Sequence, residues 1–320
     1  FDRVISFEEI IKNLKKINYL TNDTAFIKEF KMRLFLAGNK QFYQVGRLIK
    51  ICGLRDAWYE EVDDPEKIVS LLKRERNGSH IFTFFQRPPN IEPQYNYYME
   101  NYPVSIIKIN SYDDWHNKTI GKKTRYSIRK AHKEGVDIRI TEFNDDFVKG
   151  ISEIYNETPI RAGKKFPHYK DSLEKVKREN ETFKERSVFL GAYYRNELIG
   201  FTKIVIEKEF ADILQHLSKL SHKEKCASNA LMAKAIEICA SREIGYLAYG
   251  DWDESGIGLF KKNNGFTEMV LPQYYIPLNW IGHLALRFDL HKPLHKLLPK
   301  RMVPFLKDIR HKILRLRLSE

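Results

Sequence analysis

Cysteine is scarce in this chain of 320 residues: only Cys52, Cys226 and Cys239 occur, and they are widely spaced. An odd, dispersed set argues against a disulfide framework or a zinc site, so we expect a reducing compartment and no metal. Long apolar runs are also lacking, because no stretch reaches the roughly 18 uninterrupted apolar residues of a membrane-spanning helix. The N-terminus has no basic start followed by an apolar run, so no secretory signal is predicted and the cytoplasm is the default location. The first residue is Phe1 rather than Met, which predicts a fragment or a removed initiator.

Acidic residues are in deficit. The 55 Lys and Arg residues exceed the 42 Asp and Glu residues, which gives a net charge of +13. This excess predicts attraction to nucleic acid, a phosphate-bearing cofactor or a membrane surface, although it equally favours solubility. The tail 281–320 holds ten Lys and Arg against three Asp and Glu. Its apolar residues recur at helical spacing: Met302, Phe305, Leu306, Ile309, Ile313 and Leu316. This pattern predicts a basic amphipathic helix that lies on an anionic membrane, at the inner face, or packs on the N-terminal helices.

The N-terminal region reads as mainly helical up to about residue 75. Apolar residues recur at helical spacing over 5–14 and over 26–36, and Asp64-Pro65 is a typical helix start. A short strand is predicted over 80–86, followed by a loop rich in Pro and Tyr over 87–102 that we interpret as a domain boundary. The expected organisation is a helical region with a short strand over 1–100, a main domain over 101–280 and the basic helical tail over 281–320.

The main domain shows a regular order of elements. Strands are predicted over 103–109, 136–143, 187–194, 198–207, 211–220, 246–249 and 267–276. Helices are predicted over 111–134, from 144, and over 171–182, 228–241 and 256–263. Short turns join the three strands between 187 and 220, so these strands should pair antiparallel. The expected fold class is α/β (α+β), with a mixed, mostly antiparallel sheet flanked by helices on both faces.

The order β-α-α-β-β-β-α-β-α-β over 136–276 resembles the GNAT acyltransferase fold. The stretch GAYYRNELIGF (191–201) resembles the hairpin of that fold, and LFKKNNGF (259–266) resembles its late helix. RYSIRKAHKEGV (125–136), the helix opening Asn229-Ala230-Leu231 and the pair Phe260-Lys261 are similar to the Fem-like branch, which transfers amino acids to peptidoglycan precursors. The resemblance implies a twisted GNAT-type sheet and transfer of an acyl group to an amine.

Two departures from the GNAT pattern leave the donor open. The phosphate-binding loop before the central helix usually contains glycines, but SHKEKCASNALM (221–232) has none. Lys261 stands where a tyrosine usually protonates the leaving thiolate. Fem-like enzymes usually hold two such domains and a helical arm, whereas this sequence predicts one complete domain. The candidate functions are an acyl-CoA-dependent N-acyltransferase, an aminoacyl-tRNA-dependent transferase acting on a cell-wall or lipid precursor, and a catalytically silent binding module at a membrane or on nucleic acid.

The resemblance places the donor's phosphates at the start of the helix 228–241. No tightly bound cofactor is expected, because acyl-CoA or aminoacyl-tRNA would enter as a co-substrate. Backbone N–H groups of the strand holding 215–220 are the expected donors to the tetrahedral oxyanion. The residues expected to bind the donor are Leu217, Ser218, Lys223, Lys225, Ser228, Asn229 and Ala230.

The residues expected at the reacting centre are of types that move protons or bind charge. Glu157, His216 and Asp251 are candidate bases, and Lys261 is a candidate for binding a phosphate or stabilising the leaving group. The loop 157–169 lies where acceptors bind in this fold, so Arg161, His168 and Tyr169 are expected to contact the acceptor, as is Tyr249 at a strand end. For each of these residues a purely structural role, such as a helix cap, a core histidine or a surface lysine, is the competing interpretation.

Overall fold

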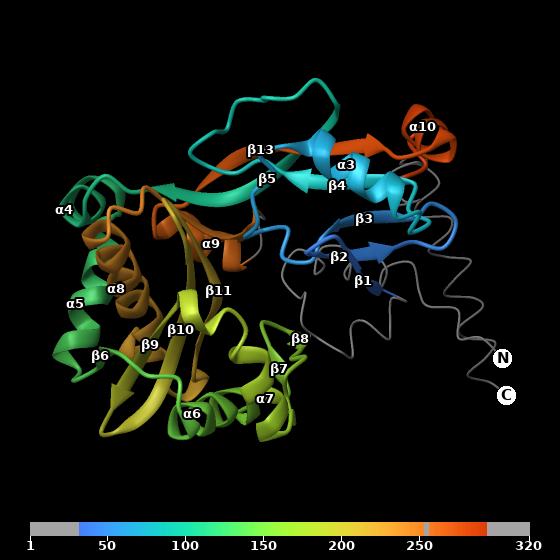
Figure 1. The fold of residues 1–320 in the computed structure, drawn as a ribbon. Helices are drawn as coiled ribbons and strands as arrows, with labels where there is room; N and C mark the ends of the chain where they lie inside the picture. Colours follow the sequence, from blue (N-terminus) through green and yellow to red (C-terminus); the bar gives the residue numbers. More distant parts are fainter. Residues whose placement is uncertain (1–31, 253–255, 293–320) are drawn as a thin grey trace, which may run out of the picture. The chain divides into compact units, whose positions relative to one another are not determined.

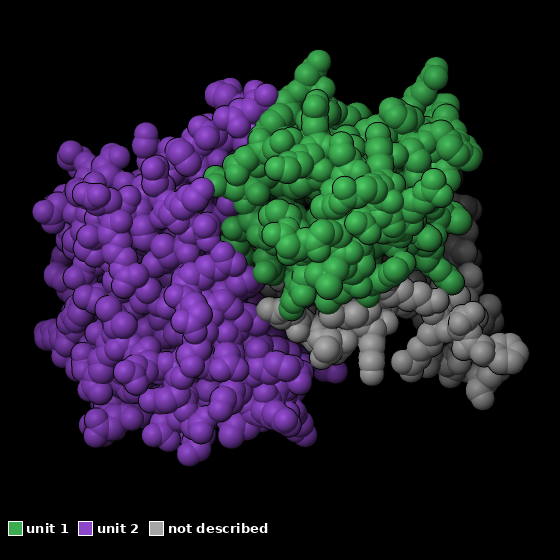
Figure 2. Space-filling view, in the orientation of Figure 1, with its two compact units in different colours: residues 1–85, 95–100, 273–320 green, residues 86–94, 101–272 purple. Residues whose placement is uncertain are grey.

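The computed structural model describes residues 32–252 and 256–292 (Figure 1). The chain divides into two compact units, drawn in different colours in Figure 2. Unit 1 comprises residues up to 85, residues 95–100 and residues from 273 onward, and unit 2 comprises 86–94 and 101–272. Unit 2 therefore covers most of the predicted main domain, but it ends eight residues before position 280.

Unit 1 is built on a small sheet. Strands β1 (Arg33–Ala37), β2 (Lys40–Val45) and β3 (Ile51–Leu54) form an antiparallel meander. Strand β3 then runs parallel to β4 (Ile81–Phe85), which pairs antiparallel with the 273–277 part of β13 (Thr267–Pro277). Helix α3 (Pro65–Arg74) buries Ile68 and Leu72 in the aromatic core of this sheet, and α10 (Trp280–Arg287) follows β13.

The helix predicted over 26–36 is wrong in its described part, because residues 33–37 form strand β1. Gly38 has φ +57° and begins a two-residue turn that pairs Ala37 with Lys40, which is hairpin geometry. The spacing of Leu34 and Leu36 fits a strand as well as it fits a helix, and the turn decides the outcome. The helix predicted from Asp64-Pro65 is confirmed, since the Asp64 side chain accepts a hydrogen bond from Lys67 N and Pro65 opens α3. The helical pattern over 5–14 lies outside the described residues.

Unit 2 is a helix-flanked, mostly antiparallel sheet, which confirms the predicted fold class. The strands lie in the order β5-β12-β11-β10-β9-β6, and among these the pair β11 and β12 is parallel. The strands are β5 (Tyr98–Lys108), β6 (Asp137–Ile140), β9 (Ser187–Tyr194), β10 (Glu197–Glu207), β11 (Phe210–Ser218) and β12 (Tyr246–Asp251).

Two helical layers cover this sheet (Figure 1). Helices α5 (Lys122–Lys133) and α8 (Ala227–Ser241) bury their apolar residues in one cluster, which also contains Trp115 and Phe266. Helices α6 (Asp145–Asn156) and α7 (Leu173–Asn180) contribute to a second cluster around Tyr155 and Phe201. Helix α9 (Gly256–Asn263) precedes β13. The remaining described helices are short: α4 (Tyr112–Asp114), the π-helix η1 (Trp115–Thr119), and the 3-10 helices η2 (Lys184–Arg186) and η3 (Leu220–Lys225).

Local details differ from the sequence prediction. The helix expected over 111–134 is interrupted, because Ile120 is extended and Gly121 caps α5. The loop 157–169 contains a two-stranded hairpin of β7 (Ile160–Arg161) and β8 (Lys164–Lys165). The glycine of the NNGF stretch, Gly265, has φ +89°, and a Cβ there would lie 2.6 Å from Thr119 Cγ2. Only glycine suits this position, which explains that part of the motif physically.

The predicted amphipathic helix of the tail, with its stripe from Met302 to Leu316, lies outside the described residues. Within 32–252 and 256–292, every helix is too short or too polar to cross a bilayer.

Candidate functional site

Strands β11 and β12 separate within unit 2. Their parallel pairing is limited to three positions, from Phe210 with Tyr246 to Asp212 with Ala248, although β11 continues to Ser218. On its other edge β11 carries a bulge, since Ile213 pairs with Ile204 and Gln215 with Lys203, which leaves Leu214 without a partner in β10. Beyond Asp212, the edge of β11 that faces β12 therefore has no ladder partner within 32–252 and 256–292. Backbone groups on this edge can serve a ligand instead.

His216 lies in this separated region. Its Nδ1 is 2.8 Å from Thr202 Oγ1, and its ring packs against Tyr249 and Phe260 with centroids 5.8 Å and 5.4 Å away. Its Nε2 is buried and has no hydrogen-bond partner among the described residues. Burial lowers the pKa of His216 to about 4, so the ring is neutral at pH 7. The arrangement presents a neutral imidazole with one nitrogen left for another group.

Lys261 is buried next to the Tyr249 ring. Its Nζ donates a hydrogen bond to the backbone carbonyl of Asp251 at 2.8 Å and lies 4.9 Å from the centroid of the Tyr249 ring. The Asp251 carboxylate accepts a hydrogen bond from the Tyr102 hydroxyl. Burial raises the pKa of Tyr249, and the Asp212 carboxylate raises it further, so this phenol stays protonated. Asp251 thus positions Lys261 through its backbone, while its side chain is bound to Tyr102, which disfavours it as a free base.

The start of α8 lies directly after β11 and η3. Ser218 Oγ and Ser228 Oγ are 2.8 Å apart, which joins the end of β11 to the first turn of α8. The helix begins after Cys226, at φ +57°, and no side chain of the described residues caps it. The uncapped N–H groups and the helix dipole favour an anion at this point. Asn229 and Ala230 belong to the same turn, whereas Leu217 packs in the cluster of α6, away from α8.

The two lysines predicted to bind the donor differ in their exposure to solvent. Lys223 is exposed. Lys225 is largely buried, with its Nζ 3.9 Å from the centroid of the Tyr194 ring and 3.6 Å from the Glu134 carboxylate. Lys223 is therefore better placed than Lys225 to meet an incoming phosphate.

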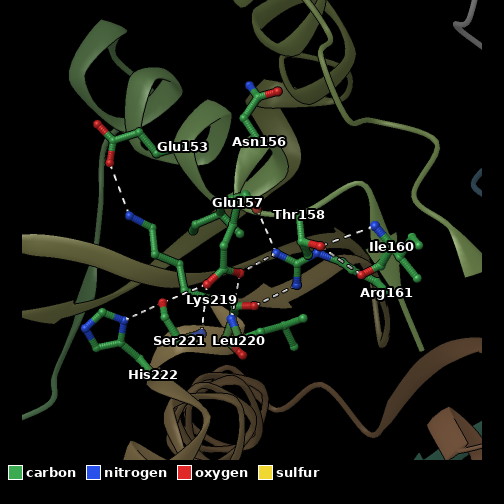
Figure 3. A network of polar contacts seen from close by, with 12 residues as sticks. Glu153, Asn156, Glu157, Thr158, Ile160, Arg161, Lys219, Leu220, Ser221 and His222 are labelled. Carbon is green, nitrogen blue, oxygen red and sulfur yellow. Dashed lines mark hydrogen bonds and ion pairs between the residues drawn. The ribbon is translucent and has the colours of Figure 1, made fainter. Parts of the chain in front are cut away.

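Glu157 caps the start of η3 (Figure 3). Its carboxylate accepts hydrogen bonds from Leu220 N at 2.7 Å, from Ser221 N and Oγ at 2.8 and 2.7 Å, and from Arg161 Nη2 at 3.1 Å. Burial opposes ionisation, but these donors outweigh it and hold the pKa of Glu157 below its usual range. A carboxylate satisfied in this way is poorly suited to act as a general base. It occupies backbone N–H groups in the loop where GNAT proteins usually have glycines.

Arg161 binds the protein itself. Its Nη1 donates to the Ser218 carbonyl at 2.8 Å, and its Nη2 donates to the Ile154 carbonyl at 2.7 Å. The guanidinium also lies 5.0 Å from the centroid of the Phe166 ring. Glu157 and Arg161 thus form a clamp between α6 and the end of β11, and both Nη atoms of Arg161 bind groups of the protein. Contact of Arg161 with an acceptor stays a prediction.

His168 belongs to a separate polar cluster. Its Nδ1 lies 3.1 Å from Asp171 Oδ2 and 3.4 Å from Glu179 Oε2, and its ring stacks on Tyr155. Lys175 Nζ approaches the same two carboxylates at 2.8 and 3.5 Å and supplies positive charge there. Tyr155 lies in the core cluster to which α6 contributes, whereas the Tyr249 and Phe260 rings around His216 pack against the core cluster to which α8 contributes. The structure therefore does not bring His168 together with His216. Tyr169, in the same loop, lies under the Lys170 ammonium, 5.6 Å from its ring centroid.

Sequence reasoning missed two buried polar residues of β10. Thr202 orients the His216 ring, as described above. Lys203 donates hydrogen bonds to the Asn180 carbonyl at 2.8 Å and to the Thr182 hydroxyl at 2.9 Å, as well as to the Thr182 carbonyl. Burial lowers the pKa of Lys203 to about 7. The available signal was the polar pair Thr-Lys inside the otherwise apolar strand LIGFTKIVIE.

Comparison with known proteins supports the fold. No protein-family model matches the chain, and no curated protein matches it in sequence. Among solved structures, the chain is similar to FemX, with 10% identity and a TM-score of 0.54 over 84% of this chain and 96% of that one. It is also similar to the C-terminal domain (DUF2156) of an Agrobacterium fabrum protein assigned as a lysylphosphatidylglycerol synthetase, with 12% identity and a TM-score of 0.52 over 88% and 96%. L-PGS from Bacillus licheniformis matches with 13% identity and a TM-score of 0.50 over 83% and 96%. This likeness shows that the chain shares the fold of these proteins, in agreement with the GNAT-type fold predicted from the sequence.

Proposed function

We propose that this protein is an N-acyltransferase that moves an acyl group from a thioester donor, such as acyl-CoA, to an amine. The observation that carries the proposal is the neutral His216, whose buried Nε2 has no partner among the described residues at the point where β11 and β12 separate. Lys261 and the uncapped start of α8 add a buried cation and an anion-binding helix end to the same unit.

The proposed reaction begins with attack of a neutral amine on the thioester carbonyl. Backbone N–H groups of β11 beyond Asp212 would stabilise the oxyanion. The attacking nitrogen becomes far more acidic once the new C–N bond forms, so even a weak base such as His216 Nε2 can accept its proton. Collapse of the intermediate expels the thiolate, and the buried Lys261 ammonium beside Tyr249 would stabilise it.

An aminoacyl-tRNA donor is the second candidate, supported by the surface of α5. Lys122, Lys123, Arg129 and Lys133 are exposed on this helix, together with Tyr126, and the helix contains no acidic residue. Cations with an exposed aromatic ring suit a nucleic-acid backbone. The acceptor would then be a cell-wall or lipid precursor. The third candidate, a silent binding module, draws on Glu157, which already occupies N–H groups that a donor phosphate would use.

The test is an assay of thiol release from a panel of acyl-CoA thioesters in the presence of amine acceptors. We expect His216→Ala to reduce the rate by about 10²- to 10⁴-fold, the usual contribution of a general base. His222→Ala is the matched control, because His222 lies in η3, just after β11, with its Nδ1 at 3.1 Å from Ser221 Oγ, and it should retain activity.

Equal activity of His216→Ala and the wild-type protein would refute the role of His216. Failure of all acyl-CoA thioesters, with product formed from aminoacyl-tRNA, would establish the second candidate. Failure of both donors to react or bind would favour the silent module.

A further inference from the structure

The outer face of α10 is apolar and exposed. Trp280, Leu284 and Phe288 recur every four residues, so they lie on one side of the helix, and they are 70%, 42% and 60% exposed. The opposite side, with Ala285 and Leu286, packs against Ile81 in the core of unit 1. An exposed stripe with two large aromatic rings is unusual on a monomeric soluble surface and marks an interaction site.

The turn between β2 and β3 lies next to α10 in unit 1 and exposes a further apolar residue. Ile49 in this turn packs against the same cluster of Ile81, Ala285 and Leu286. Its neighbour Leu48 is 87% exposed. Arg47 and Lys50 flank this pair in the sequence. The turn therefore presents an apolar tip between two cations beside the helix.

The charges around α10 favour an anionic partner. Asp289 is the only acidic residue of the described segment 278–292, and its carboxylate accepts a hydrogen bond from Tyr98 at 2.8 Å and pairs with Lys292 at 2.8 Å. Arg287 is exposed, with its guanidinium 5.9 Å from the centroid of the Phe288 ring. The carboxylates of Asp289 and Glu100 both pair with Lys292, at 2.8 and 3.5 Å, so they are held by contacts within the protein. Arg287 is the exposed cation that lies beside the apolar stripe.

We propose that α10 and the turn 46–50 form a docking surface for an anionic lipid bilayer. Trp280 and Phe288 would enter the headgroup region, where aromatic rings partition well, and Arg47, Lys50 and Arg287 would meet lipid phosphates. Apolar side chains flanked by cations suit such a bilayer better than a protein groove, which would also need directional polar partners. The inference does not depend on the acyltransferase reaction.

Co-sedimentation of the full chain with lipid vesicles tests this surface. We expect binding to phosphatidylcholine vesicles that contain phosphatidylglycerol, weak binding to pure phosphatidylcholine, and a decrease with added salt. The double variant Trp280→Ser, Phe288→Ser should partition at least about tenfold more weakly, because two large side chains lose their burial in lipid. The matched control is Ile140→Ser, Ile160→Ser, which removes two side chains of unit 2 that are 60% and 58% exposed and should bind as the wild type does.

Two results would overturn the proposal. The first is equal vesicle binding by the wild type and the α10 double variant, since another part of the chain would then carry the affinity. The second is protection of Trp280 from acrylamide quenching in vesicle-free protein, taken as the difference between the wild type and Trp280→Phe. Such protection would mean that residues 293–320 or a second copy of the chain cover this face.

Discussion

The protonation of His216 links the candidate site to the stability of the fold. Burial holds its folded-state pKa at about 4, below the ordinary value near 6.5. As the pH falls below 6.5, the unfolded chain binds a proton before the folded protein does. The contribution of the neutral His216 to the free energy of unfolding is therefore complete above pH 6.5 and is lost as the pH falls toward 4.

We predict that His216→Asn, which keeps a polar atom near Thr202 but cannot titrate, loses less stability than the wild type across this window. The difference should be at most about 3 kcal/mol, because His216 keeps partial solvent contact. Urea unfolding between pH 6.5 and 4.5 measures it, with His222→Asn as the control. Parallel pH dependences of His216→Asn and the wild type would contradict the assigned environment.

Lys203 gives a second prediction at the scale of single residues, in the alkaline range. Its pKa is lowered from about 10.5 to about 7, so above pH 7 the unfolded chain binds more protons at this amine than the folded protein. The free energy of unfolding should then rise with pH, by up to about 1.4 kcal/mol per pH unit from this group.

In Lys203→Met this contribution disappears, and unfolding curves between pH 7 and 9.5 should show a flatter dependence. Lys234→Met is a suitable control, since that amine is partly exposed and pairs only with Glu237 among the described residues. If Lys203→Met kept the wild-type slope, the buried amine would have to be charged throughout this range.

Three of the site residues predicted from the sequence lie together in the structure, whereas Glu157 is held by contacts that the sequence did not indicate. His216, Tyr249 and Lys261 were candidates, and the structure places the Tyr249 ring against the other two. Glu157 was a candidate base because it is a carboxylate in a polar loop. Its partners Leu220 and Ser221 are more than 60 positions away in the chain, so local patterns could not show that its oxygens are occupied.

At the scale of elements, the clamp of Glu157 and Arg161 fixes the end of β11. It connects the C-terminus of α6 to the turn that leads into α8, and thereby holds the helix end that we propose binds the donor. Two backbone N–H groups and a guanidinium converge on one carboxylate, so its removal should cost more than the loss of a surface ion pair.

We predict that Glu157→Gln lowers the free energy of unfolding by about 1–3 kcal/mol, because the amide group would turn a donor toward the Leu220 or Ser221 N–H. Glu153→Gln provides the matched control on the same helix. The Glu153 carboxylate is exposed and pairs with Lys219 at 3.3 Å, so it should contribute less than about 1 kcal/mol. Urea unfolding at pH 7 compares the two variants. Equal losses in the free energy of unfolding would show that Glu157 stabilises the fold no more than a surface ion pair does.

The helices and strands of unit 2 could be predicted because the spacing of their apolar residues and the positions of their turn residues indicate the same boundaries. Strand predictions over 187–194 and 198–207 match β9 and β10 to within one residue. Strands β1 to β3 were not predicted, since Phe30, Leu34 and Leu36 also fit a helical spacing and the turn at Gly38 was not recognised. The separation of β11 from β12 depends on long-range pairing, which the local sequence does not encode.

At the scale of the whole molecule, the net charge of +13 suits the polyanionic donor that we propose. Besides the neutral His216, the proposed reaction needs a site for the donor's phosphates. The start of α8 beside β11 is where a phosphate group of the donor would sit.

The most direct test of this claim compares the same substitution at opposite ends of α8. Calorimetric titration with CoA and acetyl-CoA at moderate salt should show saturable binding by the wild-type protein. Ser228→Glu places a negative charge at the proposed phosphate site and should weaken binding at least about tenfold, although a carboxylate at a helix start favours folding. Ser241→Glu, at the far end of the helix, should bind as the wild type does. Unchanged binding by Ser228→Glu, or no binding of either ligand by the wild-type protein, would contradict a CoA thioester site at this helix.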